Sequence, residues 1–230
     1  MKRKLILIMS LILVFGIVLS GCGPNNGTNG DIQGRLEAKD KRIAELEEEI
    51  DDLKSQLDGS HQGRTDNLLF RVVEIINSIK DKDFNKLSTF VHPSKGLRFS
   101  PYDYIDTETS KVFTVEEVKG LVDDEQVYLW GHYDGTGDPI ELNFNEYYER
   151  FIYDADFANP QVIGNNVAVS YGNAIDNSKE VYPDSHFIEL HFKGLDPKYE
   201  GMDWRSLKLI FEQEDGEWYL VAIVHGEWTI

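Results

Sequence analysis

Cysteine is almost absent from this chain of 230 residues, since Cys22 is the only one. A single thiol cannot form a disulfide within the chain, so no covalent bridge stabilises a fold here. A folded domain must therefore be stabilised by its hydrophobic core. Residues 62–230 are enough for one domain with a sizeable core.

Positive charge is also scarce. The chain has 23 Lys and Arg residues against 41 Asp and Glu residues, which gives a formal net charge of −18. An acidic surface repels nucleic-acid phosphates and anionic lipid head groups. We therefore exclude nucleic acid as a partner and disfavour a membrane surface held by charge. The acidity is compatible with bound divalent cations but does not demonstrate them.

Familiar catalytic motifs are missing. The sequence has no Gly-x-Ser-x-Gly elbow, no Ser-x-x-Lys motif and no phosphate-binding glycine loop. Its six histidines contain no pair four residues apart, and His186 and His191 point to opposite faces of a predicted strand. We assign no catalytic residue. A pair such as His225 with Asp203 would allow acid–base chemistry if the fold brought the two together.

The first 21 residues have the layout of a secretory signal peptide. Three basic residues open the chain, an apolar run follows over residues 5–19, and the small residues Ser20 and Gly21 come next. The run of about 15 residues is shorter than the roughly 20 that a membrane-spanning helix needs. Residues 1–21 are therefore predicted to be a signal peptide.

The sequence Leu19-Ser20-Gly21-Cys22 resembles the lipobox of bacterial lipoproteins. The resemblance implies that the thiol of Cys22 carries a diacylglyceryl group and that cleavage leaves Cys22 as the N-terminus. It also implies a lipid-anchored protein on the outer face of the cell membrane. Two acyl chains anchor firmly, because each buried CH₂ contributes about 0.8 kcal/mol. The alternative is an ordinary signal peptide, or an uncleaved anchor, with an incidental cysteine.

Residues 22–30 form a flexible tether in this interpretation, and residues 31–58 repeat apolar residues in heptads. The a positions are Leu36, Ile43, Ile50 and Leu57, and the d positions are Ile32, Lys39, Leu46 and Leu53. Charges that would face each other in a parallel dimer are opposite in sign: Arg35 with Asp40, Arg42 with Glu47, and Glu49 with Lys54. The pattern predicts a stalk that forms a parallel coiled-coil homodimer. The alternative is one amphipathic helix lying against the domain.

The domain over residues 62–230 begins with helical patterns. Apolar residues between 68 and 79 predict a helix capped by Thr65 or Asp66, and residues 84–91 predict a shorter one that stops at His92-Pro93. Capping boxes predict two further helices. These boxes pair Thr114 with Glu117 and Asn143 with Glu146.

Strand patterns dominate the last third of the chain. A short strand is predicted at 97–99, and alternating apolar residues predict strands at 167–171 and 188–192. A final hairpin is predicted from 207–211 and 218–224, with its turn at Glu214-Asp215-Gly216. The fold class is therefore α+β, with helices packed on a curved antiparallel sheet.

This order of elements resembles the cone fold of nuclear-transport-factor-like domains, in which helices cover a bent sheet and leave a pocket. The stretch from Ser100 to Ile140 is longer than that fold needs. Several strings also resemble a group of uncharacterised lipoproteins from Gram-positive bacteria, and this resemblance implies no activity. The strings are residues 96–102, 130–140, 153–157 and 203–207, with Trp218-Tyr219-Leu220 and Trp228-Thr229-Ile230.

Asp134, Asp138 and Glu141 are candidate ligands for Ca²⁺, because hard oxygen ligands on a tight turn suit this cation. Their spacing does not match the EF-hand pattern, and Asp-Gly followed by a second glycine is typical of a hairpin turn. The turn interpretation therefore competes with the metal site.

Aromatic residues beside carboxylates can bind sugars or peptides of the cell wall. The candidate ligand-binding residues are Arg98, Tyr102, Trp130, Asp134 and Trp204. Trp130 and Trp204 are expected at the surface because each adjoins a turn and charged residues. Burial in the core is the competing interpretation for such rings. Arg98 is expected to meet a ligand carboxylate or a local acid.

Three functions remain open from the sequence. The first is a non-enzymatic binding module at the cell envelope, which recognises a cell-wall component or an envelope protein. The second is an envelope enzyme that uses a cone pocket for acid–base or hydrolytic chemistry. The third is a structural domain stabilised by Ca²⁺. The lipobox, the stalk and the missing catalytic motifs favour the first.

Overall fold

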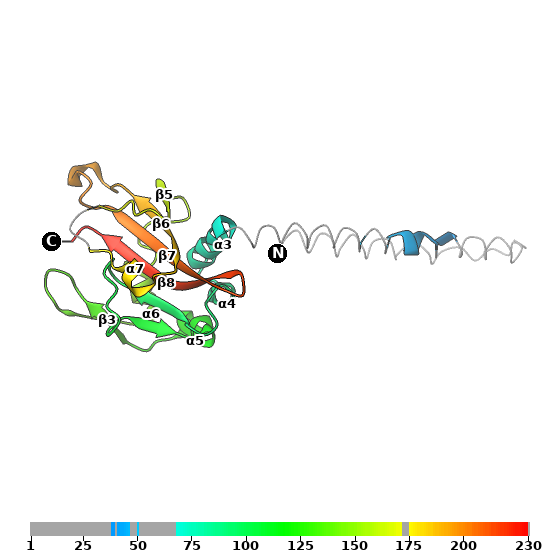
Figure 1. Cartoon of the computed structure of the whole chain (residues 1–230), viewed down its shortest axis with the longest axis horizontal. Helices are drawn as coiled ribbons and strands as arrows, with labels where there is room; N and C mark the ends of the chain where they lie inside the picture. The colour runs from blue at the N-terminus through cyan, green and yellow to red at the C-terminus, as the bar shows by residue number, and fades with distance from the viewer. Residues whose placement is uncertain (1–37, 40, 47–49, 51–67, 172–174, 230) are drawn as a thin grey trace, which may run out of the picture. The chain divides into compact units, whose positions relative to one another are not determined.

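The structure is a computed structural model that describes residues 38–39, 41–46, 50, 68–171 and 175–229 (Figure 1). The chain divides into two compact units, residues 1–58 and 59–230. In the first unit, residues 38–39, 41–46 and 50 are helical, and Arg42 donates a hydrogen bond to Glu45 at 3.2 Å. The predicted signal peptide, the tether and the caps Thr65 and Asp66 lie outside the described residues. Within the described residues, every helix is too short or too polar to cross a membrane.

The second unit is built on a six-stranded sheet in the order β2-β1-β8-β7-β6-β5. The strands β5 to β8 lie side by side in Figure 1. The bounds are β1 Leu97–Ser100, β2 Lys111–Phe113, β5 Val162–Asn165, β6 His186–Phe192, β7 Arg205–Glu214 and β8 Glu217–Glu227. Every pairing is antiparallel except that of β1 with β8, which is parallel. The predicted antiparallel hairpin is confirmed, and it turns at Asp215 and Gly216, both at positive φ.

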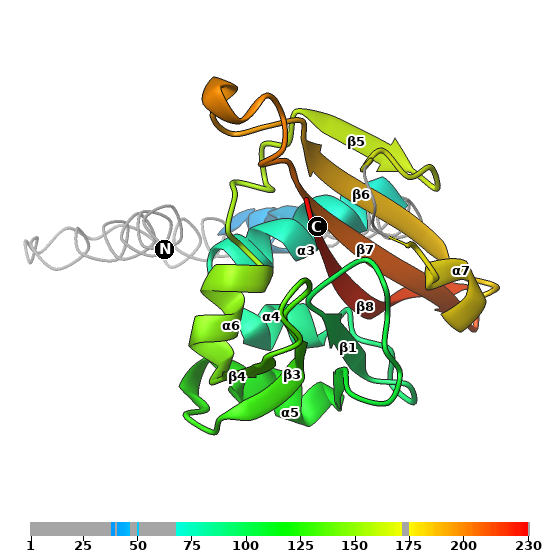
Figure 2. The same ribbon diagram turned by 90° about the vertical axis from the view of Figure 1, so that its left-hand side faces the viewer.

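A separate hairpin, β3 (Tyr128–His132) with β4 (Pro139–Leu142), lies beside α6 (Phe144–Phe151) in Figure 2. The other helices are α3 Leu68–Lys80, α4 Phe84–Ser88, α5 Val115–Gly120 and α7 Ser178–Val181. Two 3₁₀ turns, η1 Leu121–Asp123 and η2 Pro197–Tyr199, complete the elements. Both predicted capping boxes form at the starts of α5 and α6. The α+β class is therefore confirmed.

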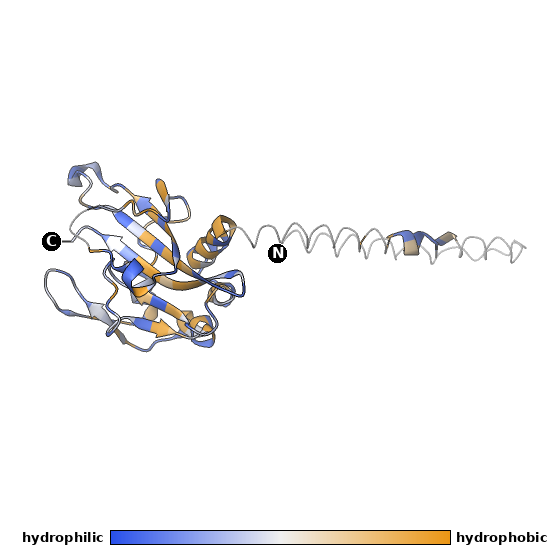
Figure 3. Ribbon diagram, in the orientation of Figure 1, coloured by the Kyte–Doolittle hydropathy of each residue, from blue (hydrophilic) through white to orange (hydrophobic). Residues whose placement is uncertain are grey.

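One face of the sheet packs against the helices. Apolar side chains of α3, α4 and α6 form a single core with those of β6, β7 and β8, among them Ile188, Leu209 and Ile223. In Figure 3, α3 and parts of these strands are coloured orange, which marks apolar residues. Aromatic rings fill the part of this core near α6, where Phe99 contacts Phe113, Trp130, Phe144 and Tyr147 edge to face.

The opposite face of the sheet is also covered. A second, smaller core contains Ile105, Tyr182, Phe187, Ile210 and Val224. The segments around Ile105 and Tyr182 cover this face, and we call them the cover. Asn177 joins them, because its side chain accepts a hydrogen bond from the Ile105 N–H at 2.7 Å and donates one to the Ile105 carbonyl at 3.1 Å. The order of the elements in the sequence predicts helices on one face of the sheet only. The central strands are instead buried on both faces.

Residues 167–171 form no strand, so the prediction of a strand there is wrong. The strand of this region is β5, and the N–H groups of Val169 and Ser170 donate to the Glu189 carboxylate at 2.9 and 3.0 Å. A buried side chain therefore takes the hydrogen bonds that a neighbouring strand would take.

The second helix also ends earlier than predicted. It stops at Ser88, and Val91 forms a bridge with Leu220.

Gly96 provides a test of how tightly β2 packs on the segment before β1. Its φ is +70°, and an added Cβ would overlap the Phe113 carbonyl oxygen. Gly216 has a similar φ of +86°, but its Cβ would meet nothing within 4 Å. We expect Gly216→Ala to lower the free energy of unfolding by about 1–2 kcal/mol through backbone strain alone. Gly96→Ala should lower it by about 1–3 kcal/mol more, because overlap adds to strain. Urea denaturation of both variants measures the difference, and equal losses would contradict this packing.

Candidate functional site

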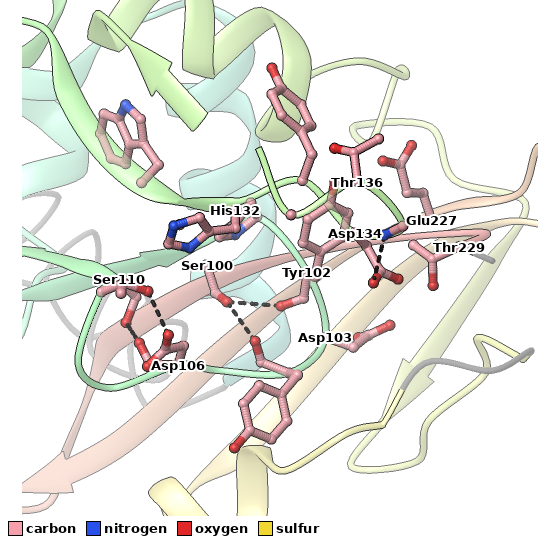
Figure 4. Close-up of a pocket in the computed structure, with 18 of the residues that line it drawn as sticks. Ser100, Tyr102, Asp103, Asp106, Ser110, His132, Asp134, Thr136, Glu227 and Thr229 are labelled. Carbon is pink, nitrogen blue, oxygen red and sulfur yellow. Dashed lines mark hydrogen bonds between the residues drawn. The ribbon is translucent and has the colours of Figure 1, made fainter. Parts of the chain in front are cut away.

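The described residues enclose a cavity of about 710 Å³ at the end of β1 and β8. One wall is the loop from Ser100 to Ser110, and the other is the end of β3 with the turn that leads to β4 (Figure 4). Ile175, Glu227 and Thr229 complete its lining. A cavity of this size can enclose a ligand of the size of a short oligosaccharide or peptide.

A second hollow of about 420 Å³ adjoins the first. The two share lining residues, among them Tyr102, Tyr133 and Asp134, and the second adds Asp138, Arg150 and Trp228. We treat the two hollows as one site and call them together the pocket.

Local hydrogen bonds shape the loop after β1. The Ser100 hydroxyl donates to the Tyr102 carbonyl at 2.8 Å and to the Tyr104 carbonyl at 3.4 Å. The Asp106 carboxylate accepts from the Thr109 hydroxyl at 2.7 Å and from the Glu108 N–H at 2.9 Å. These hydrogen bonds, that of Thr109 most of all, lower the pKa of Asp106, so it is a carboxylate at neutral pH.

The opposite wall depends on backbone conformations that glycine adopts. Gly135 and Gly137 have φ of +82° and +75°. The turn closes through the Gly137 N–H, which donates to the Tyr133 carbonyl at 2.8 Å, and the Tyr133 N–H, which donates to the Asp138 carbonyl at 2.8 Å. The Asp134 side chain accepts from the Gly135 N–H at 3.1 Å and is exposed. The glycines of this sequence therefore make a turn, as the hairpin interpretation predicts.

Two buried carboxylates lie at the floor of the pocket, and both are paired. Asp103 is 3% exposed and contacts the ammonium of Lys208 at 3.2 Å, and Lys208 also contacts Asp176 at 2.7 Å. Burial raises the pKa of Asp103 above its usual value in spite of Lys208. Glu227 is 7% exposed and contacts Arg150 at 2.5 Å and Arg205 at 3.3 Å.

Behind this floor, His225 pairs with Asp154 and not with Asp203. The His225 Nε2 lies 3.2 Å from Asp154 Oδ2, and its Nδ1 lies 3.2 Å from the Pro101 carbonyl. The proposed pair of His225 with Asp203 is therefore wrong, because Asp203 accepts from the N–H groups of Leu195 and Asp196 at 3.1 and 2.7 Å.

The His225–Asp154 pair does not line the pocket, and the His225 side chain is fully buried. Burial opposes ionisation of Asp154, but His225 and Arg205, the latter at 2.7 Å, hold the pKa of its carboxyl below the usual value. Asp154 belongs to the loop that follows α6, and its contacts with His225 and Arg205 join this loop to β8 and β7. This arrangement is structural.

Three of the five predicted ligand-binding residues line the pocket: Tyr102, Trp130 and Asp134. The surface position predicted for Trp130 is wrong. Its side chain is 0% exposed, its ring stacks on Tyr147 at 3.9 Å, and its Nε1 donates to the Leu142 carbonyl at 2.9 Å. Trp130 therefore shapes the wall from the core side.

Arg98 and Trp204 lie outside the pocket lining. Arg98 donates to the hydroxyls of Tyr182 and Ser110 at 3.0 and 2.6 Å. Trp204 is 0% exposed and packs against His191 and Tyr171, so its predicted surface position is also wrong. A turn beside each tryptophan suggested exposure, but segments distant in sequence cover both.

The predicted Ca²⁺ site gains no support from the geometry. Across residues 68–171 and 175–229, and the few described before them, no group of three or more His, Cys, Asp or Glu side chains is placed to hold a metal ion. Asp134 and Asp138 do line the second hollow together, whereas Glu141 is not among its lining residues. The Ca²⁺ site stays a prediction.

Sequence analysis missed Asp103, Asp106 and Glu227 as lining residues. Only Asp106 carried a local signal, because Asp106-Thr107-Glu108-Thr109 is a sequence in which an aspartate caps its own turn. The other two reach the pocket through strand pairing and burial that no local pattern reveals.

No protein family matches the sequence, and no curated protein matches it. Two solved structures follow part of its chain path. One, named Rd1NTF2_05 and carrying five substitutions, has a TM-score of 0.30 and 9% identity, and covers 68% of this chain and 94% of its own. The other, titled a putative calcium/calmodulin dependent protein kinase II association domain from Xanthomonas campestris, has a TM-score of 0.29 and 10% identity, and covers 69% and 82%. Likeness at this level carries no argument about function.

Asp154 gives a test of the ion pairs behind the floor. Asp154→Asn leaves His225 without its carboxylate and Arg205 with Glu227 alone, and we expect the free energy of unfolding at pH 7 to fall by about 3 kcal/mol. Since folding lowers the pKa of Asp154, its contribution is present above the ordinary value of 3.8 and is lost as the pH falls through the lower folded value. The difference from wild type should therefore shrink in acid. Denaturation from pH 7 down to about pH 3 measures it.

The control for this test is Asp184→Asn, which removes an exposed carboxylate that lines neither hollow. Its effect should stay within about 0.5 kcal/mol at every pH. A loss in Asp154→Asn that is equal at pH 7 and in acid would show that the carboxylate charge is not what stabilises this region.

Proposed function

We propose that this chain is a lipid-anchored protein on the outer face of the cell membrane, and that its domain over residues 62–230 binds a small cell-wall fragment. The observation that carries the binding proposal is the pocket of about 710 Å³ between the loop after β1 and the β3–β4 turn. Its lining combines tyrosine rings, hydroxyl groups and carboxylates, which suit the polar and apolar faces of a saccharide or peptide.

A binding module is favoured over an envelope enzyme. The space between helices and sheet is filled by aromatic rings, and the pocket lies beside it. The one histidine among the first hollow's lining residues is His132, and it has no carboxylate partner among the hydrogen bonds of the described residues. An enzyme would need an acid and a base that converge on one point of the cavity. Among the described residues, the lining places His132 near enough to Asp106 to help the Thr109 hydroxyl lower its pKa, but no hydrogen bond joins the two side chains.

The architecture that we propose is the cone fold of nuclear-transport-factor-like domains. Its support is internal to this chain: helices α3, α4 and α6 share a core with one face of the six-stranded sheet. The position of the pocket, at the end of β1 and β8, would make this a cone whose interior is filled and whose rim binds ligand.

Binding is tested by thermal unfolding of residues 62–230 with saccharide and peptide fragments of the cell wall. A ligand at about 100 times its dissociation constant should stabilise the domain by roughly 2.7 kcal/mol. Tyr104→Ala should weaken binding about fivefold, because the exposed ring lines the cavity and stacking contributes about 1 kcal/mol.

Tyr199→Ala is the matched control, since Tyr199 is 46% exposed and lies outside the pocket. Stabilisation by no fragment would contradict the proposal. A shift produced by Ca²⁺ and reversed by chelator would favour the calcium-stabilised domain in its place.

The anchor is proposed from the sequence, and the stalk over residues 31–58 is proposed to form a parallel homodimer. An alkynyl fatty acid fed to a bacterial host should label the full chain and not Cys22→Ala. A chain that begins at residue 31 should sediment as a dimer, and one that begins at residue 62 as a monomer. Labelling that persists in Cys22→Ala would contradict the anchor, and a monomer in both lengths would contradict the stalk.

A further inference from the structure

Three carboxylates that line the pocket have no cationic partner among the described residues. Asp106, Asp134 and Asp138 form no ion pair with a lysine or arginine there, whereas the buried Asp103 and Glu227 do. Exposed carboxylates elsewhere on this domain differ in this respect: Asp156 and Glu149 face a lysine within 4 Å, whereas Asp184 forms no ion pair with the described residues. The unpaired carboxylates therefore concentrate a negative potential at the pocket.

These carboxylates come from opposite walls. Asp106 belongs to the loop after β1, and Asp134 belongs to the turn between β3 and β4; Figure 4 shows the two on either side of the cavity. Hydrogen bonds from the Thr109 hydroxyl and the Glu108 N–H fix the Asp106 carboxylate and keep it ionised. A ligand in the cavity would therefore face a carboxylate on each wall.

The cations near the pocket do not cancel these charges. Arg150 contacts Glu227 at 2.5 Å and its guanidinium lies 4.5 Å from the centre of the Phe151 ring. Lys208 is fully buried between Asp103 and Asp176. His132 lines the cavity and is exposed.

Tyrosine rings supply the second, independent feature of the lining. Tyr102, Tyr104 and Tyr133 line the cavity, and Tyr104 is 57% exposed. The faces of such rings attract cations, and this attraction is strongest where water is excluded. Rings and carboxylates together suit an organic ammonium group. A bare divalent ion would need several oxygen ligands converging within about 2.6 Å, and the described residues offer no such group.

We propose that the pocket recognises its ligand through a protonated primary amine, held between Asp106 and Asp134 and against the tyrosine rings. This inference rests on the proposed binding function and names the chemistry of its ligand. An amino sugar with a free amine and a lysine-bearing peptide share this chemistry.

The test uses two matched pairs of probes with the full-length protein in neutral detergent. The first pair is the glucosamine trisaccharide and the N-acetylglucosamine trisaccharide. The second is a tripeptide that ends in lysine and the same peptide with that lysine acetylated. Both peptides carry an acetylated N-terminus, so within each pair acetylation converts every free amine into an uncharged amide. Isothermal titration should show at least about tenfold tighter binding of the free amine in one pair, and that pair identifies the source of the amine.

Two variants connect this preference to the named carboxylates. Asp106→Asn and Asp134→Asn should each weaken binding of the free amine about tenfold and leave the acetylated probe unaffected. Asp134 is exposed, so its variant is expected to fold even if Asp106→Asn disturbs its loop. Asp184→Asn removes the same charge outside the pocket and should leave both affinities unchanged.

The outcomes separate this inference from the proposed function. Equal binding of the free and acetylated probes would overturn the amine inference and leave the binding function standing. Equal weakening by Asp134→Asn and Asp184→Asn would also overturn it, because the attraction would then come from the overall charge. Binding of none of the four probes would overturn both.

Discussion

The burial of strand β8 on both of its faces is the constraint on which the rest of this domain depends. Leu220 and Ile223 belong to the core with the helices, whereas Ala222 and Val224 belong to the core on the opposite face. β8 also pairs with β7 on one side and with β1 on the other. One strand therefore contacts the helices on one face, and on the other face the loop after β1 and the segment before β6. Its end, at Glu227, is where the pocket lies.

Charged side chains in this buried layer are paired, and their pairing fixes the floor of the pocket. Lys208 on β7 contacts Asp103 from the loop and Asp176 from the cover. Arg205 contacts both Asp154 and Glu227. Breaking a buried pair is costly because it leaves an uncompensated charge. The carboxylates at the floor are thus paired with cations, whereas Asp106 and Asp134 at the walls form no ion pair with a described lysine or arginine.

Local signals in the sequence predicted much of the fold. The capping boxes at Thr114 and Asn143 and the hairpin turn at Asp215-Gly216 depend on residues within a few positions of one another, and all three form. The parallel pairing of β1 with β8 joins segments far apart in the chain, and no local pattern predicts it. The error at residues 167–171 has the same origin, because Glu189 on another strand takes the hydrogen bonds of Val169.

The site was predicted in part for similar reasons. Tyr102 and Asp134 belong to loops that their own turn residues shape, and both line the cavity. Trp130 and Trp204 are buried by partners that their neighbours in sequence do not reveal, Tyr147 and His191.

The central claim is that this cavity is where the domain binds its ligand. The most direct measurement is an amide NMR titration of residues 62–230 with a cell-wall fragment. The account predicts shifts that saturate and are confined to residues 100–110, 131–138 and the end of β8. Saturating shifts that map to another surface, or no shift with any fragment, would contradict it.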